Sequence, residues 1–194
     1  MTDTLEEVRK NIFVVKPKWV QAWAVDRILE LVKDKDFVDS TQYVHGKISV
    51  NKEFRSSTSY SSVNDAQVNE LLLLIRDALF TDFFGEQADK WKAGATHFDI
   101  IKYCEGNELK PHADYFGDIT PDRRYTIIIG LKQAQLGGET SFVELNKSVL
   151  LGVGDVLLFE NLLPNGKPNS LSHHAGNKVI KGEKLVAVMF VNDI

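Results

Sequence analysis

The feature that most constrains the fold is a succession of short apolar segments after Trp91, each followed by turn-forming residues. The segments are rich in β-branched and aromatic residues, and clusters of Gly, Asn, Asp or Pro separate them, which is typical of short strands joined by turns. They are Phe98–Tyr103, Tyr125–Leu131, Thr140–Leu145, Val156–Phe159 and Leu185–Val191. This succession predicts an antiparallel sandwich or barrel in the second half of the chain.

The first half of the chain shows helical periodicity instead. Apolar residues recur at three- and four-residue steps from Pro17 to Val32, and again from Val63 to Phe84, where Asn64 or Asp65 is the expected N-cap. Residues 43–62, between the two helices, are rich in Ser, Thr and aromatic residues and predict short strands and loops. Helices followed by strands predict an α+β fold, mainly β, with the helices packed on one sheet.

Length and composition limit the class of protein. The 194 residues suit one domain, and 23 basic against 27 acidic side chains give a net charge of −4, which argues against a nucleic-acid-binding surface. The single cysteine, Cys104, excludes an internal disulfide framework. Met1–Lys10 lacks the apolar core of a secretory signal, and no apolar run approaches the roughly 20 residues of a membrane span. We therefore expect a cytoplasmic protein without membrane or nucleic-acid partners.

Two His-x-Asp sequences are candidates for a metal site. Residues i and i+2 of a strand point to the same side, so His97 with Asp99, or His112 with Asp114, can present two ligands together. Two imidazoles and one carboxylate on one face form the facial triad of non-haem iron(II) sites. His97 begins a regular strand segment, which favours a structural histidine, whereas His112 follows Pro111 near a turn. These surroundings favour His112 and Asp114.

The third ligand is less determined by the pattern. His173 and His174 are adjacent and face opposite ways on a strand, so only one of them can join the other two ligands. His45 lies in a Val-His-Gly turn and ranks behind both. The spacing alone leaves the choice between His173 and His174 open.

Five short motifs occur in order between Tyr103 and Phe190. They are Tyr103-Cys-Glu-Gly106 with Pro111-His-Ala-Asp114, Arg123-Arg-Tyr-Thr126, Gly137-Gly-Glu-Thr-Ser-Phe142, Gly154-Asp-Val-Leu-Leu-Phe159, and His174-Ala-Gly176 continuing to Lys184. In this order they resemble the motifs of the prolyl 4-hydroxylase-like family of 2-oxoglutarate- and iron(II)-dependent oxygenases. The resemblance covers nearly half of the chain and implies a double-stranded β-helix, or jelly roll.

The resemblance also implies a ligand set and its cofactors. His112, Asp114 and His174, rather than His173, match the family's metal ligands. The implied cofactors are Fe(II), 2-oxoglutarate as cosubstrate and O₂, with ascorbate as a further one. Lys184 matches the basic residue that pairs with the distal carboxylate of 2-oxoglutarate, and with the metal ligands it completes the implied catalytic set. Taken alone, Lys184 would be expected to be a solvated lysine beside a strand.

Further residues match positions near the cosubstrate and the substrate. Tyr103 and Thr126 correspond to hydroxyls that hydrogen-bond the cosubstrate, and Arg123 to an arginine at the substrate entrance. Period-two alternation places Thr126 on the same face as Gly130, consistent with an inward side chain. The chain departs from the pattern at Gly130, where some relatives carry tyrosine, and at Phe190, where many carry tryptophan. Leu109 replaces a frequent aromatic residue.

The implied function is hydroxylation of a peptidyl residue, proline, with release of succinate and CO₂ and a proline-containing peptide or protein as partner. We expect one dioxygenase domain over residues 1–194, with 1–92 as helical support and substrate-lid region and 93–194 as the catalytic jelly-roll core. The Ser-rich residues 54–65 are the expected lid. Two alternatives remain: a hydroxylase of another peptidyl residue or free amino acid, and an inactive jelly-roll binding module.

Overall fold

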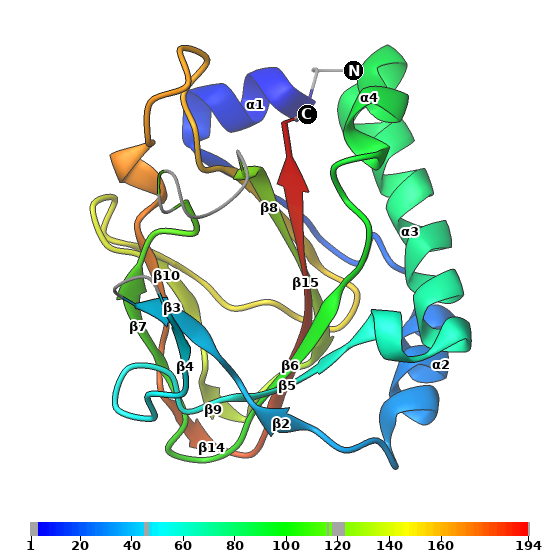
Figure 1. Cartoon of the computed structure of the whole chain (residues 1–194), viewed down its shortest axis with the longest axis vertical. Helices are drawn as coiled ribbons and strands as arrows, with labels where there is room; N and C mark the ends of the chain where they lie inside the picture. The colour runs from blue at the N-terminus through cyan, green and yellow to red at the C-terminus, as the bar shows by residue number, and fades with distance from the viewer. Residues whose placement is uncertain (1–3, 45–46, 116, 118–122, 194) are drawn as a thin grey trace.

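Two antiparallel sheets face each other in the computed structural model, and helices cover the outer face of one of them (Figure 1). The structure describes residues 4–44, 47–115, 117 and 123–193. The larger sheet has seven strands in the order β1-β12-β8-β15-β6-β5-β2. Their bounds are β1 Phe13–Lys16, β12 Val156–Glu160, β8 Arg123–Lys132, β15 Lys184–Asn192, β6 Asp99–Tyr103, β5 Thr58–Ser61 and β2 Val38–Asp39.

The smaller sheet has four strands in the order β11-β10-β13-β7. Its strands are β11 Lys147–Val149, β10 Thr140–Phe142, β13 His174–Gly176 and β7 Leu109–His112. Two further strand pairs are β14 Val179–Lys181 with β9 Leu136–Gly137, and β3 Gln42–Val44 with β4 Lys47–Ser49. The facing antiparallel sheets form a double-stranded β-helix, which confirms the predicted fold class.

Helices α1 Thr4–Asn11, α2 Ala22–Val32, α3 Ala66–Phe84 and α4 Ala88–Lys92 share one apolar core with the larger sheet. Short 3₁₀ turns lie at Ser62–Asn64, Gly85–Gln87 and Ser170–Ser172. Asp65, one of the two predicted candidates, is the N-cap of α3, because its carboxylate accepts hydrogen bonds from the backbone N–H groups of Gln67 and Val68. No helix in the described part of the chain is long and apolar enough to cross a membrane.

The predicted start of the first long helix is wrong. We expected it at Pro17, but α2 begins at Ala22. The intervening residues form a turn: Lys18 has a φ of +50°, and the backbone N–H of Val20 donates to the carbonyl of Gly154. This segment is therefore tied to the loop before β12, and its backbone donors are not available to a helix.

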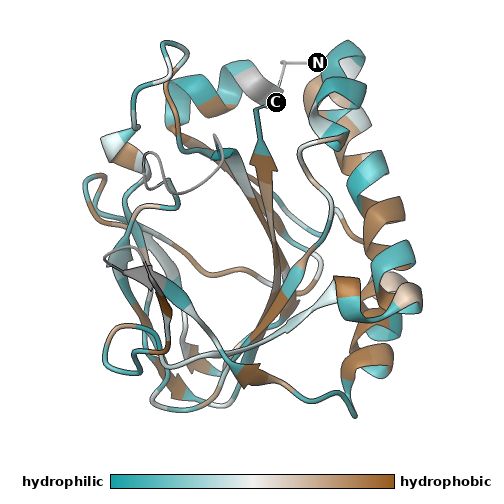
Figure 2. Cartoon of the chain, viewed as in Figure 1, coloured by the Kyte–Doolittle hydropathy of each residue, from teal (hydrophilic) through white to brown (hydrophobic). Residues whose placement is uncertain are grey.

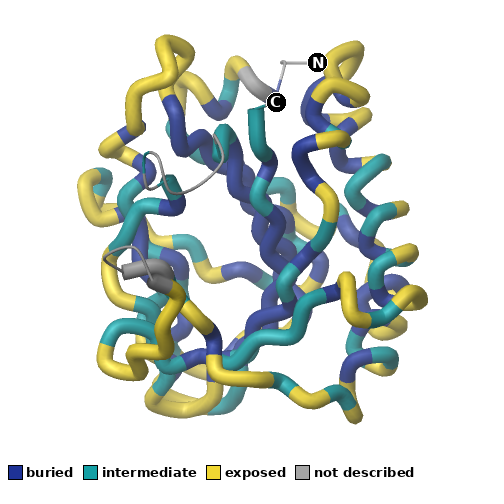
Figure 3. The backbone as a smooth tube through the Cα atoms, viewed as in Figure 1, coloured by how far each residue is buried: buried dark blue, intermediate teal, exposed yellow. Residues whose placement is uncertain are grey.

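Both faces of the larger sheet are buried, and strand alternation separates two cores. On β15, Leu185, Ala187 and Met189 pack against the helices, whereas Val186 and Val188 face the smaller sheet. Figure 2 shows hydrophobic residues along β15 and α3. Figure 3 shows that β15, at the centre of the larger sheet, is mostly buried. The inner core between the sheets is smaller, because a cavity occupies part of that space.

The first half of the chain contributes more than helical support. Strands β1, β2 and β5 all come from residues before 92, and all three belong to the larger sheet. Within the Ser-rich segment predicted as a lid, residues 58–61 form β5, which pairs with β6 along its whole length. These four residues are part of the sheet, because their backbone groups are used in its hydrogen-bond ladder.

Candidate metal centre and cosubstrate cavity

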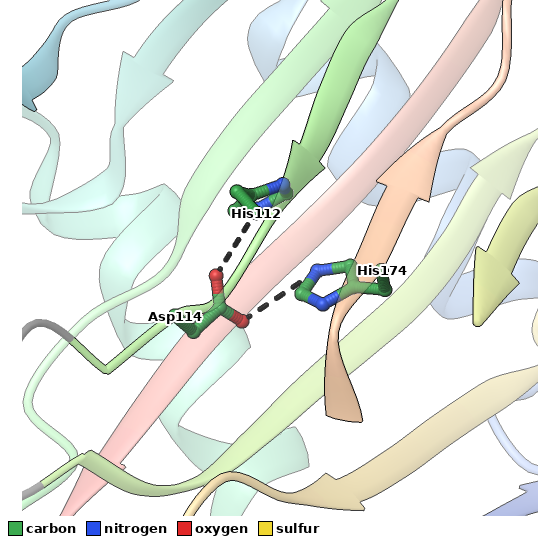
Figure 4. A group of neighbouring side chains, drawn as sticks. All are labelled: His112, Asp114 and His174. Carbon is green, nitrogen blue, oxygen red and sulfur yellow. Dashed lines mark ion pairs between the residues drawn. The ribbon is translucent and has the colours of Figure 1, made fainter. Parts of the chain in front are cut away.

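Three potential metal ligands converge between the two sheets (Figure 4). His112 ends β7, Asp114 follows two residues later, and His174 begins β13 directly opposite His112 in the ladder. One ligand atom from each side chain lies within 4.8 Å of the others. The distance from Asp114 Oδ1 to His112 Nε2 is 3.3 Å, and that from Asp114 Oδ2 to His174 Nε2 is 3.8 Å. Among the described residues this is the one cluster with metal-site geometry.

The backbone orients both imidazoles. Nδ1 of His112 lies 2.9 Å from the carbonyl oxygen of Lys110, and Nδ1 of His174 lies 2.9 Å from that of Ser172. A carbonyl only accepts, so Nδ1 carries the proton in each ring and Nε2 keeps its lone pair. Both Nε2 atoms face Asp114. A backbone partner on the other ring nitrogen is typical of metal-ligating histidines.

The charge states suit a cation. Burial lowers the pKa of His174 to about 4, although the Asp114 carboxylate opposes this effect, so the imidazole is neutral near pH 7. Burial alone would raise the pKa of Asp114, but its interactions with His174, His112 and Thr126 outweigh this effect and hold that pKa well below its usual range. Two imidazoles and one carboxylate are the ligand set of iron(II) facial-triad sites.

The start of β8 holds Asp114 in place. Oγ1 of Thr126 donates a 2.7 Å hydrogen bond to Asp114 Oδ2, and Nη1 of Arg123 donates a 3.2 Å bond to the Asp114 carbonyl. Thr126 points inward, as its alternation predicts, but its hydroxyl has a single proton, which goes to Asp114. The expected contact from Thr126 to a cosubstrate carboxylate needs that same proton.

The other histidine candidates lie elsewhere. His97 precedes β6, and its Nδ1 is 3.1 Å from the hydroxyl oxygen of Thr96. His173 precedes β13, and its carbonyl accepts a hydrogen bond from the backbone of Val143. Neither belongs to the metal cluster. His45 lies outside the described residues.

Lys184 faces the same cavity as the three ligands. It begins β15, pairs with Tyr103 of β6 in the ladder, and its Nζ lies 5.4 Å from the centre of the Tyr103 ring. Only 7% of Lys184 is exposed, and no hydrogen bond or ion pair joins its ammonium to another described residue. Burial lowers the pKa of Lys184 to about 8, a change that Glu139 partly opposes.

Two glycines allow close backbone approaches near the cavity. Gly138 has a φ of +79°, and a Cβ there would lie 3.4 Å from Cδ of Lys184, so its backbone curves closely around the lysine stem. At Gly130, a Cβ would lie 2.1 Å from the carbonyl oxygen of Gly152. The backbone at Gly152 therefore occupies the space that a side chain at position 130 would need.

Sequence reasoning missed two polar residues near this centre. Arg55 lines the cavity, with Nε donating to Ser57 Oγ at 3.1 Å, although its segment was interpreted only as part of a lid. Asn161 follows β12, and its Nδ2 donates to Thr126 Oγ1 at 2.8 Å. The Ser-rich sequence around Arg55 predicted only a lid, and nothing in the sequence pattern marked Asn161.

A second cavity lies next to the first. Val188 and Phe190 line both, and Asp99, His97 and Arg123 line the second only. The Arg123 guanidinium carbon lies 3.8 Å from the centre of the Phe190 ring, so the arginine and the aromatic ring stack beside the metal ligands.

Comparisons with known proteins agree with this arrangement. Residues 98–192 match the family model described as the 2OG-Fe(II) oxygenase superfamily. Prolyl 4-hydroxylase 13 of Arabidopsis thaliana is 34% identical over 116 residues, which cover 50% of this chain and 42% of that protein. The chain thus spans less than half the length of the curated relatives it matches.

Solved structures share the fold over nearly the whole chain. The viral collagen prolyl hydroxylase of Paramecium bursaria Chlorella virus-1, solved as a 2OG complex, has a TM-score of 0.74 at 18% identity, covering 94% of this chain and 97% of that one. A Trichoplax adhaerens prolyl hydroxylase, solved with a hypoxia inducible factor peptide fragment, has a TM-score of 0.71 at 16% identity, covering 98% and 88%.

The part of the chain from residue 98 to residue 192 belongs to the 2OG-Fe(II) oxygenase superfamily. Within that superfamily it is prolyl 4-hydroxylase-like, which confirms the resemblance predicted from its five motifs.

Proposed function

We propose that residues 1–194 form a 2-oxoglutarate- and iron(II)-dependent dioxygenase domain that hydroxylates peptidyl proline and releases succinate and CO₂. The observation that carries the proposal is one cavity lined by His112, Asp114, His174 and the buried Lys184. A metal site and a cation without a partner among the described residues, both lining one cavity, suit a dicarboxylate that chelates the metal at one end and meets a cation at the other.

The chain's own residues would bind and orient the reactants. His112, Asp114 and His174 would hold iron(II), which supplies O₂ activation and oxidative decarboxylation of 2-oxoglutarate when bound. Lys184 would pair with the distal carboxylate of the cosubstrate, and the inner face of β15 would keep water away from it. Val186 and Val188 form part of this apolar wall. The proposed cofactor set also includes ascorbate, as the resemblance implies.

A peptide substrate fits the site better than a free amino acid. The second cavity extends the site past Val188 and Phe190, so a chain segment flanking the reacting residue has space beside the metal centre. Its lining includes Asp99 and Arg123, which offer an acceptor and donors for peptide groups. Arg123, stacked on Phe190, lies where we propose that the substrate enters.

The experiment is a succinate-release assay with iron(II) and 2-oxoglutarate over proline-containing peptides. Mass spectrometry of the peptide should show a gain of one oxygen atom on proline, and His174→Ala should abolish both products. Succinate release coupled to free proline but to no peptide would support the free amino acid alternative. Wild-type protein that binds neither iron nor 2-oxoglutarate would support the inactive binding module instead.

The cytoplasmic location expected from the sequence is also part of the proposal. Its support is the single cysteine, Cys104, which is exposed and free and therefore suits a reducing compartment. Cell fractionation of the native protein would test it, and recovery in the secreted fraction would contradict it.

A further inference from the structure

We propose that Thr126 and Asn161 are positioning residues, which form a hydrogen-bond relay that orients the Asp114 carboxylate for metal binding. This inference rests on the metal site proposed above. It concerns the protein's own side chains and involves neither cosubstrate nor peptide.

The relay is continuous and buried. Asn161 Nδ2 donates to Thr126 Oγ1 at 2.8 Å, and Thr126 Oγ1 donates to Asp114 Oδ2 at 2.7 Å. The exposed fractions are 2% for Asn161, 1% for Thr126 and 6% for Asp114. Bulk water therefore does not compete for these groups, and each hydrogen bond orients its partner strongly.

The chemistry of the groups fixes the direction of every bond. The ionised carboxylate of Asp114 can only accept, so the hydroxyl of Thr126 must give it its one proton. Thr126 can then only accept from its other neighbour, which must be the amide nitrogen of Asn161. This orientation leaves Asn161 Oδ1 buried without a hydrogen-bond partner among the described residues. An amide that leaves its own acceptor unsatisfied is oriented for the donor it provides to Thr126.

The two carboxylate oxygens of Asp114 have different neighbours. Oδ2 is engaged by Thr126, whereas Oδ1 faces Nε2 of His112 at 3.3 Å. Arg123, on the same strand as Thr126, holds the Asp114 carbonyl. Both the backbone and the carboxylate of Asp114 are thus fixed before a metal arrives, and binding does not need to order them.

The first test is the affinity for Mn²⁺ alone, measured by calorimetry without 2-oxoglutarate. Thr126→Val keeps the side-chain shape but removes the hydroxyl, and we expect about 10- to 100-fold weaker binding, as for other partners of metal ligands. Thr126→Ser keeps the hydroxyl and should bind nearly as the wild type does. Thr140→Val is the matched control, because Thr140 is 3% exposed and lines the same cavity, but no hydrogen bond joins it to Asp114.

Asn161 is tested through Thr126. Asn161→Leu should weaken Mn²⁺ binding about fivefold, the value of one neutral hydrogen bond, in the wild-type background. In the Thr126→Val background it should have no further effect, because the residue it acts through has lost its hydroxyl. Equal losses in both backgrounds would overturn the role of Asn161.

The outcomes separate the relay from the metal site. Wild-type protein that does not bind Mn²⁺ would overturn the proposed site itself. Wild-type binding with an unchanged affinity in Thr126→Val would overturn the relay and leave the site intact. Equal weakening by Thr126→Val and Thr140→Val, with equal losses in thermal stability, would show a packing role for Thr126 and would also overturn the relay.

Discussion

Replacing Lys184 by methionine tests whether this residue binds the cosubstrate. Methionine keeps an unbranched stem of similar length but carries no charge. Lys184 is 7% exposed, and burial lowers its pKa from 10.5 to about 8. At about 1.4 kcal/mol per pKa unit, this difference means that burial disfavours the ammonium by about 3 kcal/mol. A carboxylate that pairs with Lys184 relieves this cost.

The expected result is an apparent KM for 2-oxoglutarate about 100-fold higher in Lys184→Met, because about 3 kcal/mol corresponds to two factors of ten. This value lies within the range for truncating one partner of a buried charge pair. Iron affinity without 2-oxoglutarate should not change, since the three ligands remain.

The assay is succinate release at saturating iron, with 2-oxoglutarate varied. Lys132→Met is the matched control, because Lys132 lies on the neighbouring strand β8 but is exposed and paired with Glu183 at 2.9 Å. An unchanged KM in Lys184→Met would refute the assignment of Lys184. A KM raised equally by Lys132→Met would show a nonspecific charge effect.

Three further predictions concern pH, the metal ligands and the cavity wall. The folded pKa of Lys184, about 8, lies below 10.5, so its charge is lost as pH rises through about 8. The KM for 2-oxoglutarate should rise above about pH 8 in the wild type but stay level in Lys184→Arg. The free energy of unfolding without 2-oxoglutarate should increase between about pH 8 and pH 10.5, because the unfolded chain binds the proton there and the folded chain does not. His174→Ala should abolish iron binding measured by calorimetry while His173→Ala retains it, and the reverse result would contradict the ligand set. Gly130→Ala should cost about 1–3 kcal/mol in thermal unfolding, since its Cβ would lie 2.1 Å from the Gly152 carbonyl oxygen; an unchanged melting temperature would disprove that contact.

Strong local patterns predicted the central elements. Strands β6, β8, β12 and β15 contain short runs of aliphatic and aromatic residues, and alternation along β8 correctly placed Thr126 on its inward face. Asp65 was also a predictable N-cap candidate for α3, because a carboxylate just before an apolar helical stripe can accept hydrogen bonds from the first backbone N–H groups of the helix.

Short or irregular elements were not predictable. Strand β7 contains Pro111 and shows no clean alternation of burial, and β13 has only three residues. Such strands owe their conformation to pairing with distant segments rather than to intrinsic propensity. Helix α1 has a polar sequence, and it packs into the helix-side core through Val8.

The surroundings of the metal ligands also depend on distant segments. Asn161 is 35 residues from Thr126, and Thr126 is 12 residues from Asp114. The sequence could suggest that Thr126 points inward. The group that accepts its hydroxyl proton depends on how β7, β8 and β12 lie relative to one another. Motif order could propose the ligand set, whereas the hydrogen bonds that orient it became visible only in the fold.

The alternation along β15 has a consequence for protein engineering. Val186, Val188 and Phe190 line the reaction cavity, while Leu185 and Met189 belong to the core under the helices. Exchanges at the first three positions should therefore change the wall of the cavity together with the core between the sheets. Exchanges at the other two should affect the core under the helices and leave the cavity wall unchanged. A library confined to every second residue of this strand can explore new cavity shapes while the core under the helices stays constant.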